Sequence, residues 1–166
     1  LIFIIIMNFI QYSLILLVSF LGIISGFILS LIAPEELRSG KRYFDWLARI
    51  IVFLIMFFFI IYTKATSFHY IFLVIIILLV LFTKNKYLDY SYPLFSIVIF
   101  FSLESTTLLL IQSSLIFILG LVIASLFMTK YENKEKIIGS RIKIFGLLLL
   151  RYVLFLIIGL LFYLFA

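Results

Sequence analysis

Residues 9–42 read FIQYSLILLVSFLGIISGFILSLI followed at once by APEELRSGKR. The first part, 9–32, is an apolar run longer than the about 20 residues that a helix needs to cross a bilayer. The second part, 33–42, holds Pro34, two acids and three basic residues. A long apolar run that ends in a short charged gap is typical of a membrane-spanning segment and its loop.

The same alternation continues along the 166 residues, of which 67% are hydrophobic against about 45–50% in soluble domains. Mean hydropathy is +1.41. In hydrocarbon each backbone polar group must be paired within its own segment, and the runs lack the period-two pattern of a barrel. The sequence therefore predicts an all-α, polytopic transmembrane bundle, a single domain over 1–166 with spans at approximately 9–32, 44–63, 68–83, 86–102, 106–128 and 144–165.

Six helices would form three hairpins, and the short third and fourth spans leave four or five helices as alternatives. Basic residues cluster in alternate gaps, which predicts orientation because cytoplasmic loops carry the excess of Lys and Arg. The gaps after spans one, three and five are basic, whereas the opposite side has only Lys64. We expect those three gaps in the cytoplasm and both termini on the non-cytoplasmic side of a cell membrane.

The net charge of +6 is spread over short gaps that flank the spans, which favours anionic lipid headgroups over nucleic acid as the partner. The candidate headgroup contacts are Lys41, Arg42, Lys130, Lys134, Lys136, Arg141 and Lys143. The mixed charges of 129–143 predict a short interfacial helix that ends near Gly139. Residues 1–6 lack the basic region and cleavage site of a secretory signal, so we expect no cleavage there.

The charged gap 33–42 has the composition of a sharp reversal. Pro34 suits the first position of a helix, and Glu35 and Glu36 suit its N-terminal turn. Gly40 is expected to adopt a left-handed conformation before Lys41.

Small residues recur on one face of the first span. Gly22, Gly26 and Ser30 are four residues apart, which lets two helix backbones approach closely. Gly120 and Ala124 form a weaker counterpart on the fifth span. Contact between these two helices of the same chain is the favoured reading, and a dimer interface is the alternative.

Aromatic residues lie near the predicted ends of the spans, where amphipathic rings anchor a protein at the bilayer surface. They are Tyr12, Tyr62 and Tyr70 on one side, and Tyr43, Trp46, Tyr87, Tyr90 and Tyr92 on the other.

Ionisable residues inside the spans are the default functional candidates, since placing one in hydrocarbon costs about 2.5–3.5 kcal/mol. Arg151 lies about two turns inside the sixth span, and Asp89 is its expected partner. Asp45 is a second potential partner, although Arg49 lies one turn away from it on the same helix. A structural Arg held by carbonyls or lipid phosphate is an equally good reading.

Glu104 lies between two apolar runs, next to Ser105 and Thr106. In an exterior turn, Ser105 or Thr106 would cap the next helix and Glu104 would complement the helix N-terminus. In a break buried within the bundle, these oxygens would form a site for Na⁺ or a proton. The turn is favoured, because the charge alternation then remains intact. Gln112 adds polarity two turns further on.

No catalytic arrangement, cofactor motif or metal site is visible, and we do not expect an enzyme. The chain has no Cys and one His, His69. Two functions remain: a small ion or solute transporter, with a pathway near Glu104, Gln112 and Arg151, or a non-catalytic membrane scaffold. The polar residues of the last three spans favour transport slightly. Either a homo-oligomer or a partner subunit is compatible with both.

Overall fold

A computed structural model describes residues 9–62, 91–132 and 140–165. Within these residues every segment is helical apart from two single-residue connections, at Ala33 and Ser105. This confirms the predicted all-α class for the described part of the chain. Four of the helices are long and apolar enough to cross a membrane.

The elements follow one another in the order α1 (Phe9–Ile32), α2 (Pro34–Tyr62), η2 (Tyr92–Leu94), α5 (Phe95–Phe101), η3 (Ser102–Glu104), α6 (Thr106–Glu132) and α7 (Ser140–Phe165). The candidate spans are Phe9–Ile32, Ser39–Tyr62, Thr106–Thr129 and Lys143–Phe165. They lie where we expected spans at 9–32, 44–63, 106–128 and 144–165. The expected span at 68–83 and residues 86–90 of the next fall outside the described residues.

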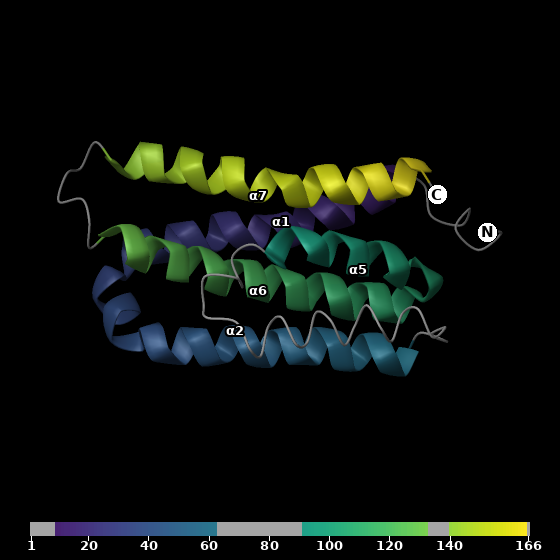
Figure 1. Ribbon diagram of the computed structural model, residues 1–166, viewed down its shortest axis with the longest axis horizontal. Coiled ribbons are helices and arrows are strands. Elements are labelled where there is room, and N and C mark those ends of the chain that lie inside the picture. Colours follow the sequence, from purple (N-terminus) through teal and green to yellow (C-terminus); the bar gives the residue numbers. More distant parts are fainter. Residues whose placement is uncertain (1–8, 63–90, 133–139, 166) are drawn as a thin grey trace.

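Helix α6 lies in the middle of the bundle and packs most extensively against α1 and α2 (Figure 1). Helices α1 and α6 run in the same direction, because Gly22 and Gly26 meet Phe117 and Leu121 in the same order. Helix α7 runs opposite to α1: Tyr12 stacks on Tyr163 near one end, whereas Phe27 contacts Phe145 near the other. Contacts between α1 and α2, neighbours in sequence, are sparse. Arrangement as three hairpins stays a prediction, since the expected span at 68–83 and its connection to the next span lie outside the described residues.

The segment Tyr92–Glu104 is apolar but too short to cross a bilayer by itself. It begins at the level of Ser19, in the middle of α1, and ends at the turn before α6. Helix α5 is buried along six of its seven residues and packs against α7 and α6. The described part of the fourth expected span is thus a core helix in one half of the bundle.

The predicted left-handed turn at Gly40 is wrong. Helix α2 begins directly at Pro34 and continues through Gly40, and no described glycine has a positive φ. Pro34 lacks an N–H that a first helical position would leave unused, and Glu35 and Glu36 favour the N-terminal turn. The change of chain direction therefore begins at Ala33 and is completed over the first turns of α2. Figure 1 shows the first turns of α2 lying across the end of the bundle.

Candidate functional site

The small-residue stripe of α1 faces α6 of the same chain. A Cβ added to Gly22 would collide with the backbone of Phe117, and one added to Gly26 would collide with that of Leu121. Gly120 of α6 in turn faces α1, because a Cβ added to it would lie 3.1 Å from the backbone nitrogen of Ile23. Main chains approach this closely only where side chains are missing, as in other small-residue helix pairs. This face is therefore used within the chain, between residues 95 positions apart in the sequence.

Serine hydroxyls add polar contacts to the same interface. Ser125, on α6, donates to the carbonyl of Gly26 at 3.4 Å and to Leu121 at 2.9 Å. Ser19, on α1, donates to Ile15 of its own helix at 2.9 Å and reaches Ser113 at 3.4 Å. Ala124 is fully buried, and Ser30 donates to Phe27 within its own helix.

Tyr92, the first residue of η2, contacts α1, α6 and α7. Its hydroxyl donates to the carbonyl of Ser19 on α1 at 3.3 Å. Its ring meets two rings of α7: that of Tyr152 edge-on, with 5.5 Å between ring centroids, and that of Phe155, with 5.1 Å between centroids. Gly120 on α6 leaves room for its hydroxyl. The side chain is fully buried, so the expected anchoring role of Tyr92 at the bilayer surface is wrong.

Tyr12 is likewise buried rather than an interfacial anchor. Its hydroxyl donates to the carbonyl of Gly159 on α7 at 3.0 Å. Tyr43, Trp46 and Tyr62 are exposed towards the ends of the candidate span Ser39–Tyr62, as surface anchors would be. Tyr70, Tyr87 and Tyr90 lie outside the described residues.

Gln112 joins α6 to α2. Its Nε2 donates to the backbone carbonyl of Ile55 at 2.8 Å, and the side chain is fully buried. Its Oε1 has no hydrogen-bond partner in the described part of the chain. A buried acceptor without a donor costs about 1–3 kcal/mol, so Gln112 is the most conspicuous polar group of the bundle interior.

Glu104 is exposed at the turn between η3 and α6. Ser105 has an extended backbone, and its Oγ accepts a hydrogen bond from the N–H of Leu108 at 3.4 Å. This is the geometry of an N-cap. Thr106, the first residue of α6, is exposed as well. The arrangement is that of a capped turn, with the Glu104 carboxylate beside a helix N-terminus.

Arg151 lies on the face of α7 that meets α6. Its guanidinium carbon is 5.7 Å from the ring centroid of Phe127 and 5.9 Å from that of Tyr152. Phe127 is 21 residues beyond Thr106, or about 30 Å along α6. The structure therefore does not bring Arg151 together with Glu104, and Gln112 faces α2 at a third position. Asp89 is outside the described residues.

Charge is distributed unequally between the two ends of the bundle. One end is formed by the end of α1, the start of α2, the end of α6 and the start of α7 (Figure 1). Every Lys and Arg in 9–62, 91–132 and 140–165 lies in the half of its span next to this basic end, or just beyond the span: Arg38, Lys41, Arg42, Arg49, Lys130, Arg141, Lys143 and Arg151. Lys134 and Lys136 fall outside the described residues. At the opposite end the described residues carry one charge, Glu104.

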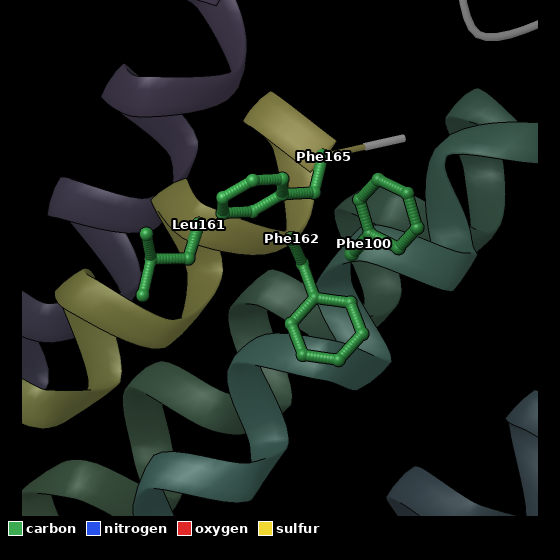
Figure 2. Close-up of a pocket in the computed structure, with 4 residues that line it drawn as sticks. All are labelled: Phe100, Leu161, Phe162 and Phe165. Carbon is green, nitrogen blue, oxygen red and sulfur yellow. The ribbon is translucent and has the colours of Figure 1, made fainter.

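An apolar pocket of about 360 Å³ opens at the opposite end, between α5 and the last turns of α7. Figure 2 shows the four residues that line it, Phe100 on α5 and Leu161, Phe162 and Phe165 on α7. Carbon lines this pocket, so it offers no group for acid–base chemistry or for holding an ion. Within the described residues no three His, Cys, Asp or Glu side chains gather where a metal could bind.

Comparison of the chain with protein-family models, with curated proteins and with solved structures finds no match. The sequence indicates Gln112, Arg151 and the small residues as candidates but predicts surface positions for Tyr12 and Tyr92, which the structure buries. The pairing of Tyr92 with Gly120 has no local sequence signal, since it joins residues 28 positions apart.

Proposed function

We propose that this integral membrane protein is a non-catalytic scaffold or accessory subunit that packs against other membrane helices. The observation that carries the proposal is how its buried polar groups are used. Tyr12, Tyr92 and Gln112 each donate to a backbone carbonyl of a different helix. Hydrogen bonds of this kind hold helices together in a bilayer, because the hydrocarbon contains no water that could replace either partner.

The charge distribution supports an orientation for this protein. Cytoplasmic ends of membrane helices carry the excess of Lys and Arg. The basic end would then face the cytoplasm of a cell membrane, and the start of α1 and the end of α7 would lie outside. Phe9 and Tyr163, whose rings are 5.6 Å apart, place these two helix ends together.

Transport of an ion or small solute is the second candidate. It is favoured by the 3₁₀ turn η2, which contains Pro93 at the level of the middle of α1. Interrupted helices near the bilayer midplane form the binding sites of many transporters. The fully buried Ser96 and Gln112 lie in this half of the bundle.

Single Cys substitutions separate the two functions, because the chain has no Cys of its own. Glu104→Cys and Lys143→Cys would be exposed to a membrane-impermeant maleimide in intact cells and again after permeabilisation. The scaffold proposal expects position 104 to react from outside and position 143 only after permeabilisation. Proteoliposomes of the unsubstituted chain should also be no more permeable to protons and Na⁺ than empty vesicles. Protection of position 104 until denaturation, together with a flux abolished by Glu104→Gln, would establish transport instead.

A further inference from the structure

One face of α2 combines an exposed cation with a row of exposed apolar side chains. Positions 42, 46, 50, 53 and 57 recur every three or four residues and so share a face of the helix. Arg42 is exposed, Trp46 is 62% exposed and Phe53 is 61% exposed. Ile50 and Phe57 are exposed as well, and the Phe53 and Phe57 rings stack at 6.2 Å.

We propose that this face, the α2 stripe, binds an anionic phospholipid, with the phosphate at Arg42 and an acyl chain along Trp46, Ile50 and Phe53. The inference rests on the proposed function only in requiring that the helices span a bilayer. It adds a specific lipid partner, which the proposed function does not name.

The length of the stripe fits one leaflet. Eleven residues separate Arg42 from Phe53, which is about 16 Å along a helix. Half of a hydrocarbon core of roughly 30 Å is about 15 Å. With Arg42 at the level of the headgroups, a few Å outside that core, Phe53 lies deep in the same leaflet and Phe57, one turn further on, lies at the middle of the bilayer, where acyl chains end. Trp46, one turn below Arg42, then falls at the glycerol level that tryptophan prefers.

The charge of the stripe selects the class of lipid. Arg42 offers several N–H donors in a plane that matches two phosphate oxygens, and Lys41 is exposed next to it. Asp45 and Arg49, one turn apart on α2, are half-buried on the flank of the stripe, and the exposed Glu35 and Glu36 precede Arg42 by about two turns. A partner helix would have to supply an acid opposite Arg42, whereas an anionic phospholipid supplies charge and apolar chain in one molecule.

Trp46 is the single tryptophan of the chain and lies within the stripe, so its fluorescence reports directly on the occupant. The protein would be reconstituted into symmetric vesicles of phosphatidylcholine. Phosphatidylglycerol with brominated chains would then be added in one series, and brominated phosphatidylcholine at equal mole fraction in another. A symmetric bilayer makes the result independent of orientation.

We expect half-maximal quenching at an about fivefold lower mole fraction of the anionic lipid, the preference that one basic residue near the surface confers. Arg42→Gln should abolish the preference. Lys143→Gln is the matched control, because it removes an exposed cation from the same end of the bundle on α7 and should leave the preference intact.

Equal quenching by the two lipids, or a preference that survives Arg42→Gln, overturns the lipid site but not the membrane bundle. Protection of Trp46 from both lipids and from aqueous acrylamide would mean that protein covers the stripe, and also overturns it. Quenching by acrylamide without quenching by either lipid would instead contradict membrane insertion and the proposed function with it.

Discussion

The hydroxyl oxygen of Tyr92 lies 2.8 Å from the position that a Cβ on Gly120 would take. The same Cβ would lie 3.3 Å from the backbone carbon of Gly22. Gly120 is therefore a point at which α1, α6 and η2 all lie in close contact. An exposed or loosely packed glycine would not carry this constraint.

Gly120→Ala should lower the free energy of unfolding by about 1–3 kcal/mol, the usual cost of overpacking a core. Combining it with Tyr92→Phe, which removes the hydroxyl facing the new methyl, should cost less than the sum of the two single changes. A double-mutant cycle in detergent, followed by helical circular dichroism, measures the coupling. Strict additivity would show that the hydroxyl and the glycine do not share the same space.

Gly22→Ala and Gly26→Ala should each destabilise the bundle by at least as much, because the added methyl meets backbone rather than a movable side chain. Thermal unfolding of the purified variants would reveal this as a lower transition temperature. Gly146→Ala is the control: nothing lies within 4 Å of its Cβ position, and alanine favours a helix over glycine. If all three variants behaved alike, close packing of α1 on α6 would be wrong.

Tyr12→Phe should cost about 0.5–1.5 kcal/mol, since it removes the 3.0 Å hydrogen bond to Gly159 while retaining the stacked ring on Tyr163. Tyr62→Phe, at an exposed end of α2, should be neutral. Unfolding with increasing fractions of sodium dodecyl sulfate would compare the two. A neutral Tyr12→Phe would mean that water or lipid replaces the bond.

Gln112→Leu should change stability by less than about 1 kcal/mol, because it removes one hydrogen bond and at the same time a buried acceptor that lacks a donor among the described residues. Gln112→Glu should be strongly destabilising, since it places a negative charge against apolar side chains of α2. Both variants would be compared by the fraction that stays monodisperse after heating. A stable and functional Gln112→Glu would favour a polar pathway at this position.

The length of the apolar runs predicted α1, α6 and α7 well, because hydrophobic thickness limits how short a spanning helix can be. Hydropathy reports depth in the bilayer but not which way a side chain faces around the helix. For that reason the sequence predicts surface positions for Tyr12 and Tyr92, both near predicted span ends, although the structure buries them. The prediction of a turn at Gly40 is wrong for a related reason: glycine is permitted both in turns and within helices, so its presence in the sequence does not decide between them.

The candidate pathway residues illustrate a second limit. Glu104 and Arg151 are both polar residues within apolar surroundings, and the topology predicted from the sequence places them towards opposite sides of the membrane but does not say which helices they contact. The parallel course of α1 and α6 and the antiparallel course of α7 place them at opposite ends of α6, and these directions depend on contacts between residues far apart in the chain.

Ser105→Ala should destabilise the start of α6 by about 1 kcal/mol, because the hydroxyl accepts the N–H of Leu108 that no helical carbonyl can reach. Ser114→Ala is the matched control, since the exposed Ser114 only donates to Leu110 of its own helix. Glu104→Gln should fall within about 0.5 kcal/mol of the unsubstituted protein, as expected of an exposed surface change. Amide hydrogen exchange over 106–109 would measure the fraying of this turn directly. A large loss with Glu104→Gln and none with Ser105→Ala would contradict the capped turn and indicate that the carboxylate is held inside the bundle.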